Sequence, residues 1–422
     1  MKKTCFILLI GIASFRTYSQ TNTLTTVQPT TEKEWDVSLY GFVRNDFIWD
    51  SRKSAVVREG NLNLYPLDIV LDANGEDINA TPQSNFLAIT SRLGIKAKGP
   101  DVWGAKISSV LEGDFFGNVE GGTIGLLRLR HAYVNLEWPK TVLTIGQTWY
   151  PQFIPEIFPG VANFNTGIMF NPFGWATQAK IKQMVSKEIS VTFVAYKERE
   201  FTTPGPGTQN SASINSILPS LNAQIQYKTK NILWGLGAEY KSLKPLTVSN
   251  NLVSNETVNS SSFFGYAKYS NDRFSIKAYG ITGGNLNNLV MLGGYTGKTI
   301  AGQVETYEPT KTTAFWLDLA SNAKSIAPGF FFGYTKNNGS KEDNSTATFV
   351  DYIRGINGNR VVDNVWRASG RIDFKKNKFR ITPELEYTAA TWGDLIKTNA
   401  TAGANKTNVG NMRTMISCSY SF

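Results

Sequence analysis

The lengths of the links between alternating segments constrain the fold of this chain more than any other feature. From Trp35 onward, segments of roughly ten residues with period-two hydrophobicity are separated by links rich in Gly, Asn, Ser, Thr and Pro. Short and long links follow one another in regular alternation. The short links fall at 99–101, 139–140, 186–187, 229–230, 271–272, 322–325 and 375–378, and the long links at 50–85, 115–125, 150–174, 198–220, 242–260, 282–312, 336–363 and 389–410.

This alternation predicts an up-and-down β-barrel. Sixteen strands between Trp35 and Phe422 require seven tight turns and eight long loops, which is the observed set of links. Outer-membrane barrels have short turns at one rim and long loops at the other, whereas a sandwich or propeller has no reason to separate them. We therefore predict an all-β fold: a transmembrane antiparallel β-barrel of about 16 strands, with an inward-folded third outer loop.

Individual segments show one charged and one apolar face. In 366–374, Arg367, Ser369, Arg371 and Asp373 share a face, and the opposite face carries apolar side chains and a glycine. Charged residues make up 18% of the chain and aromatic residues 12%, with a mean hydropathy of −0.22. This composition suits strands that separate lipid from water.

The first residues predict export. Two lysines at positions 2 and 3 precede a short apolar run, and Ser19 is a small residue that a signal peptidase accepts. We predict a signal peptide over residues 1–19, a short flexible lead-in over 20–34 and the barrel over 35–422. No stretch of 18 or more apolar residues follows the signal, so no spanning helix is expected.

Cysteine and charge content narrow the partners. Cys418 is the only cysteine after the predicted signal, so we expect no disulfide, no metal site and no cofactor. The formal charge is +10, or +7 without the three basic residues of the signal. In an exported protein this balance favours outer-membrane lipid, lipopolysaccharide and small anionic solutes as partners, not nucleic acid. The last strand ends in Phe422, which resembles the C-terminal assembly signal of bacterial barrels.

A barrel of sixteen strands leaves an aqueous lumen, whereas eight strands are filled by their own side chains. Period-two alternation places carboxylates such as Glu112 and Asp114 on the inward faces together with many basic side chains. Either these charges simply pair along a wet wall, or the excess of arginine attracts anions. The predicted pore-lining residues are Arg44, Arg92, Arg128, Arg130, Lys180, Arg367, Arg371 and Arg380.

The long link at 150–174 differs from the others because it is rich in Pro and Phe and has Glu156 as its single charged residue. An apolar loop of this length is unfavourable in bulk water, so we expect it to fold into the lumen. Packing at a subunit interface or over the barrel mouth is the alternative. The residues predicted to form the constriction are Phe153, Glu156, Phe158 and Phe164.

Four segments resemble the sequence pattern of DcaP-like outer-membrane porins, namely 127–133, 146–149, 40–46 and 113–117. The resemblance implies a homotrimeric sixteen-stranded channel of the bacterial outer membrane, with pore arginines that favour small anions such as dicarboxylates. It assigns Arg44, Arg128 and Arg130 to the pore. The long helical N-terminal extension of some members is missing, so trimerisation is expected to depend on barrel contacts. The end of the signal and the Asn- and Lys-rich loops suit a Bacteroidota source.

Two other classes of protein are compatible with a barrel. A barrel enzyme needs an activated nucleophile or an acid–base pair, but His131 lies in mid-strand, on the face that we assign to Leu129 and Tyr133. Glu384 and Glu386 share a face and are interpreted as lumen carboxylates that balance arginines. A non-conducting structural or adhesin-like barrel is the other alternative, and full pairing of the arginine cluster would favour it. We expect a passive porin, not an enzyme.

Overall fold

The computed structural model describes residues 35–117, 125–164, 166–341, 343 and 346–422. The predicted signal peptide and lead-in lie outside these residues, and both stay predictions. In the described part, helices are confined to α1 (Ser211–Asn215) and the 3₁₀ turn η1 (Asn287–Leu289). No helix among these residues is long and apolar enough to cross a membrane.

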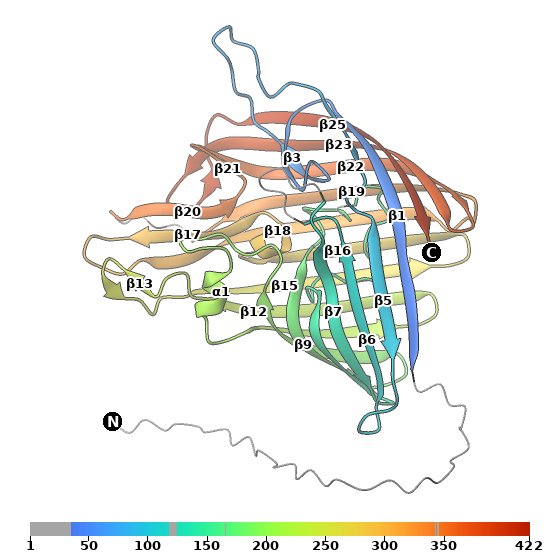
Figure 1. The fold of residues 1–422 in the computed structure, drawn as a ribbon. Helices are drawn as coiled ribbons and strands as arrows, with labels where there is room; N and C mark the ends of the chain where they lie inside the picture. Colours follow the sequence, from blue (N-terminus) through green and yellow to red (C-terminus); the bar gives the residue numbers. More distant parts are fainter. Residues whose placement is uncertain (1–34, 118–124, 165, 342, 344–345) are drawn as a thin grey trace, which may run out of the picture. The chain divides into compact units, whose positions relative to one another are not determined.

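Sixteen wall strands form one closed antiparallel barrel (Figure 1), which confirms the predicted fold class and strand number. Both β4 and β5 pair with β1, so together they make the second wall strand. The wall consists of β1 (Asp36–Asp50), β4 (Gln83–Leu87) with β5 (Arg92–Lys98), β6 (Lys106–Asp114), β7 (Arg128–Glu137), β8 (Thr141–Trp149), β9 (Trp175–Met184), β10 (Ile189–Glu198), β11 (Ser220–Lys228), β12 (Ile232–Leu243), β15 (Val258–Ser270), β16 (Phe274–Gly284), β18 (Thr306–Ser321), β19 (Ile326–Gly339), β22 (Arg360–Lys376), β23 (Phe379–Ile396) and β25 (Thr407–Ser421).

The first and last wall strands close the barrel. β1 pairs antiparallel with β25 from Phe42 opposite Ser421 to Asp50 opposite Arg413. Closure removes the two free strand edges, whose unpaired backbone groups would be costly in lipid. The terminal aromatic strand therefore has a structural role as the seam of the barrel.

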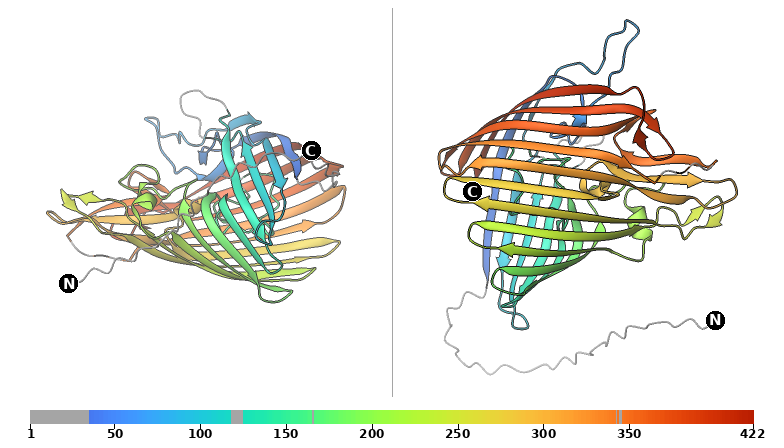
Figure 2. Two further views of the ribbon diagram at one scale, coloured as in Figure 1. Left: turned by 60° about the horizontal axis from the view of Figure 1, so that its bottom comes forward. Right: turned by 180° about the vertical axis from the view of Figure 1, so that it is seen from behind.

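The short links form tight turns at one end of the barrel (Figure 2). Asn377 and Lys378 connect β22 to β23, with Asn377 at φ 55°, a left-handed conformation that asparagine tolerates. At the β15–β16 turn, the Asn271 side-chain oxygen accepts hydrogen bonds from the backbone N–H groups of Arg273 (2.8 Å) and Phe274 (2.9 Å). Turn chemistry is local, so the sequence locates these links accurately.

The long links contain structure that the sequence pattern did not predict. β17 pairs with both β18 and β20, which extends the sheet beyond the wall on the long-loop side. We expected only loops here, because short strands in polar links carry too few alternations to be recognised. The added elements are β2 (Ser54–Val57), β3 (Leu62–Pro66), β13 (Val248–Ser249), β14 (Leu252–Val253), β17 (Gly293–Thr299), β20 (Thr348–Arg354), β21 (Ile356–Asn357) and β24 (Thr401–Ala402).

Apolar side chains occupy both surfaces of the wall. On the outer surface they remain exposed in the isolated chain, as with Leu39 (61%) and Phe263 (61%), which suits contact with lipid. On the inner surface the largest apolar cluster joins the wall to three segments of the long links: 62–65, 150–176 and 286–292. Of these segments, 62–65 and 286–292 lie at the end of the barrel that carries the long loops.

Candidate functional site

The strand pair β7–β8 explains why the 127–133 and 146–149 segments occur together. A β-bulge adds one residue to β7 at Arg130, so Arg130 and His131 are both buried while Leu129 stays half exposed. Gln147 on β8 donates its side-chain amide to the carbonyl oxygens of Leu129 (2.8 Å) and Arg130 (3.3 Å), two residues that are not paired with β8. The expectation that His131 shares a face with Leu129 is wrong, because simple alternation does not reveal a bulge.

Five arginines and four carboxylates meet beside this bulge. Arg130 donates Nε to Glu112 (2.7 Å) and Nη1 to Asp114 (2.9 Å). Arg128 bridges Asp114 (2.8 Å) and Glu200 (2.8 Å). The cluster consists of the arginines Arg44, Arg58, Arg92, Arg128 and Arg130 with the carboxylates Asp46, Glu112, Asp114 and Glu200.

Pairing in this cluster is uneven. Arg44 lies 2.9 Å from Asp46, but the closest carboxylate atom to Arg92 is Glu112 Oε1 at 3.5 Å. Because arginines outnumber carboxylates by one, the cluster as a whole stays positive. The buried Nη2 of Arg130 also has no hydrogen-bond partner among the described residues. The wall therefore combines strong internal pairing with a residual positive charge.

An aromatic stack joins the long link at 150–174 to these arginines. The rings of Trp149 and Phe153 stack with centroids 4.0 Å apart, and Trp149 stacks on Trp175 at 4.3 Å. The guanidinium groups of Arg128 and Arg130 lie 4.5 and 4.4 Å from the Trp175 ring centroid. Stacking and cation–π attraction fix the start of the loop against the wall.

Buried carboxylates on the wall hold the backbone of the same loop. The N–H groups of Ala162 (2.6 Å) and Asn163 (3.0 Å) donate to one oxygen of Glu384, and Gly160 N–H donates to Asp318 (3.2 Å). Since β18 and β23 are separated in the wall, these bonds place residues 160–163 between non-adjacent strands. The Glu384 carboxylate therefore binds the backbone of the 150–174 link.

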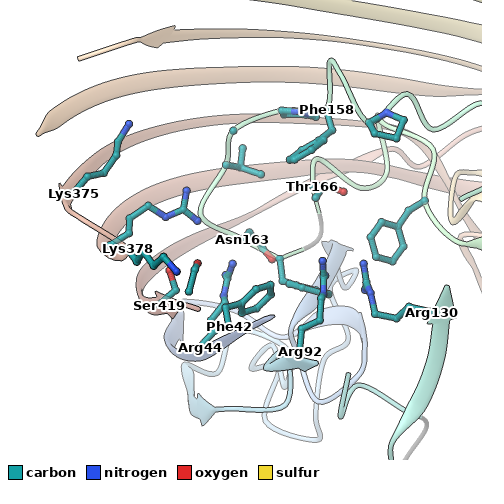
Figure 3. A pocket seen from close by; sticks show the side chains of 18 of the residues that line it. Phe42, Arg44, Arg92, Arg130, Phe158, Asn163, Thr166, Lys375, Lys378 and Ser419 are labelled. Carbon is teal, nitrogen blue, oxygen red and sulfur yellow. The ribbon is translucent and has the colours of Figure 1, made fainter. Parts of the chain in front are cut away.

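A cavity of about 590 Å³ lies between residues 153–164 and the wall, and reaches the turn between β22 and β23 (Figure 3). The aromatic side of its lining includes Phe42, Trp149, Phe153, Phe158 and Phe164. No carboxylate occurs among the described residues that line it. Its basic side chains are Arg44, Arg92, Arg130, Lys375, Lys378 and Arg380.

The predicted pore residues have different surroundings. Arg44, Arg92, Arg130 and Arg380 line the 590 Å³ cavity, whereas Lys180 lines a second cavity behind the loop. Arg128 lies outside both linings. The remaining two arginines contact other parts of the chain. Arg367 donates to the carbonyl oxygen of Ile168 in the 150–174 link (2.6 Å), and Arg371 lies 2.9 Å from Asp318 on β18.

The predicted constriction residues also fall on two sides. Phe153, Phe158 and Phe164 line the 590 Å³ cavity, but Glu156 does not. Glu156 forms an ion pair with Lys228 and accepts a hydrogen bond from Gln226 (3.3 Å), on the wall behind the loop. The one acidic residue of this link therefore leaves the 590 Å³ cavity without a negative charge.

Sequence reasoning missed the contacts that hold the first long link. Arg413 donates to both oxygens of Asp50 (2.8 Å each) and to the carbonyl oxygen of Gly60 (3.0 Å). Asn63 donates to Glu386 (3.0 Å). Arg413 lies on the inward face of the last strand, which is a usable signal, but its pairing with Asp50 depends on barrel closure.

The comparisons with known proteins agree with this fold. A family model described as "DcaP outer membrane protein" matches residues 10–289. The structure is similar to the outer membrane channel DcaP of Acinetobacter baumannii, with 17% identity, TM-score 0.65, and coverage of 93% of this chain and 99% of that chain. An anion-selective porin from Comamonas acidovorans has 12% identity and TM-score 0.53, with coverage of 92% and 100%. OmpT of Vibrio cholerae has 10% identity and TM-score 0.54, with coverage of 94% of this chain and 100% of that chain. No curated protein matches.

Proposed function

The chain belongs to the DcaP outer membrane protein family and is a β-barrel of the bacterial outer membrane, and we propose that it acts there as a porin. Small hydrophilic solutes would diffuse through it passively, with a preference for anions such as dicarboxylates. The similarity in fold to a DcaP channel and to an anion-selective porin supports this proposal. No enzymatic step is needed for it.

The observation that carries the anion preference is the lining of the 590 Å³ cavity. Six basic side chains face a space without a described carboxylate, so an anion there gains attraction that a cation lacks. Arg44, Arg92 and Arg130 come from β1, β5 and β7, while Lys375 lies at the end of β22 and Lys378 in the turn to β23 (Figure 3). Two groups of cations on different parts of the wall suit a solute with two carboxylates.

We propose that the 150–174 link narrows the channel. Phe153, Phe158 and Phe164 form an apolar side opposite the basic wall, and buried bonds to Glu384 and Asp318 hold the loop there. A channel with one apolar and one basic side orients an anionic solute toward the arginines.

The test is single-channel conductance of the purified protein in a planar bilayer, with a salt gradient to give the reversal potential. We expect discrete steps and a reversal potential on the anion side, shifted toward neutrality in the Arg92→Gln/Arg380→Gln double variant. Arg273→Gln removes one charge at an exposed turn and should leave the potential unchanged. A wild-type reversal potential on the cation side would contradict the anion preference.

A non-conducting structural barrel is the second candidate, and two observations favour it. The arginine cluster is extensively paired, and segments 62–65 and 286–292 fill the long-loop end of the lumen. Folded protein that inserts into the bilayer without any conductance would support this candidate. Folding is checked independently by the mobility difference between heated and unheated samples.

We also propose a homotrimer in contact with outer-membrane lipid and lipopolysaccharide. The resemblance in the 127–133 and 146–149 segments supports the assembly, and the exposed apolar outer face supports the lipid contact. Native mass spectrometry from detergent tests the trimer. A purely monomeric species at all detergent concentrations would contradict it.

A further inference from the structure

A second, smaller cavity of about 170 Å³ lies behind the start of the 150–174 link. The loop covers it from one side with residues 150–156, and the wall strands β8, β9, β10, β11 and β15 form the other side. The charged residues of the lining are Glu156, Lys180 and Lys182, and its polar residues include Thr148, Thr192 and Tyr266.

Two lysines on one face of β9 supply the positive charge. Lys180 and Lys182 are two residues apart, which puts their Cα atoms roughly 6.6 Å apart along the strand. Within the described part of the chain, Lys182 has one hydrogen bond, a long one of 3.4 Å to Gln226. Lys180 forms no hydrogen bond or ion pair with any residue that the structure describes.

The negative charge in this cavity is already paired with a cation outside the lining. Glu156 is the single carboxylate among the described lining residues, and Lys228 and Gln226 bind its two oxygens. Lys228 itself does not line the cavity. The space around Lys180 and Lys182 therefore has two ammonium groups and no free carboxylate.

Two like charges beside a half-open, partly apolar space repel each other unless a counter-ion or water compensates them. The hydroxyl groups of Thr148, Thr192 and Tyr266 also line the cavity and can act as donors. A site that holds a single water needs only about 10–15 Å³, so this volume admits a small polyatomic ion together with waters. An anion with several oxygens satisfies ammonium and hydroxyl donors at once.

We propose that this cavity is a second anion-binding site, built by Lys180 and Lys182, for a small tetrahedral oxyanion such as inorganic phosphate or sulfate. The stacked rings of Trp149 and Phe153 line both cavities and separate this site from the arginine-lined cavity. The site is thus distinct from the one that carries the proposed porin function. It does not depend on that function, because binding here needs no conduction.

The test uses crystals of the full-length mature protein soaked in millimolar selenate, a tetrahedral oxyanion that is located by its anomalous scattering. We expect a peak within hydrogen-bond distance of Lys180 Nζ and Lys182 Nζ. The peak should disappear in Lys180→Met, which keeps the chain length but removes the charge. Lys96→Met is the matched control, since Lys96 lies over the Tyr40 ring and lines neither cavity.

Titration calorimetry with phosphate and with sulfate gives a second measurement in solution. Binding should weaken at least about tenfold in Lys180→Met, which is the loss expected when one charged hydrogen bond worth ~1.4 kcal/mol is removed. Lys182→Gln replaces the first variant if that one fails to fold. Three outcomes would overturn the proposal. The wild type could show no selenate peak, it could bind an adventitious ion only, with a peak that needs molar selenate, or the peak could persist in Lys180→Met. A conducting channel without this peak would remove the second site alone.

Discussion

The two ends of the lumen differ in what fills them. At the long-loop end, buried apolar side chains of β3 and of residues 286–292 pack against the wall. At the short-turn end, the 590 Å³ cavity is bordered by basic side chains and by the aromatic side of the 150–174 link. One barrel therefore has an end stabilised by packing and an end shaped by charge.

The difference follows from the lengths of the links. Two-residue turns are too short to place side chains in the lumen, so the wall itself lines the short-turn end. Links of twenty or more residues can fold back, and those rich in apolar residues do so because burial removes them from water. Selectivity is thus expected at the turn side of the 150–174 link, and passage at the loop end is expected to depend on the inserted segments.

The largest effect should come from removing an inserted segment. Replacing the β2–β3 hairpin, residues 54–66, with a short Gly-Ser link deletes the buried side chains of β3 and the Asn63–Glu386 bond. The deletion also removes Arg58, which pairs with Glu200, but no residue of 54–66 lines the 590 Å³ cavity. We therefore expect a severalfold rise in single-channel conductance with a smaller change in ion preference. Planar-bilayer recording measures both quantities.

Its control shortens the exposed part of the same link, residues 71–75, whose contacts lie within its own turn. That variant should conduct like the wild type. Equal conductance of the hairpin deletion and the wild type would show that the packed end does not limit passage, and the contrast between the two ends would lose its functional meaning.

The charge that lines the 590 Å³ cavity is tested through Arg130. Arg130→Gln leaves the buried Glu112 without its closest cation and leaves Asp114 paired with Arg128 alone, so the free energy of unfolding should fall by about 3–5 kcal/mol. The reversal potential should also move toward cations. Denaturant titration in detergent micelles gives the first value. Arg92→Gln, whose nearest carboxylate is 3.5 Å away, should move the potential with a smaller loss of stability.

The sequence predicted the wall better than the lumen. Strand number, the links and the inward faces of β22 and β23 follow from local alternation and turn residues, which need no knowledge of distant contacts. His131 points inward because of a bulge in β7. The pairing of Asp50 depends on barrel closure, and the pairing of Glu156 depends on how the 150–174 link folds. Those features arise from contacts across the barrel, which one sequence does not encode locally.

The bulge itself provides a smaller effect. Gln147→Leu removes the donor that satisfies the carbonyl oxygens of Leu129 and Arg130, and the free energy of unfolding should fall by about 1–3 kcal/mol. Gln183→Leu is the matched control, because Gln183 is exposed and bonds only at the surface. If both variants lose the same stability, the amide of Gln147 does not support the bulge and another contact positions Arg130.

The smallest effect concerns how each side holds the loop between the two cavities. Glu156→Gln weakens a half-exposed ion pair with Lys228, so we expect a loss of stability below about 1 kcal/mol. Glu384→Gln changes a buried acceptor of the backbone N–H groups of Ala162 and Asn163, and its loss should be clearly larger. If Glu156→Gln proves the more costly change, the loop is held mainly from the lysine wall. In that case the tether to Glu384 contributes little, and the basic cavity owes its shape to the wall behind the loop.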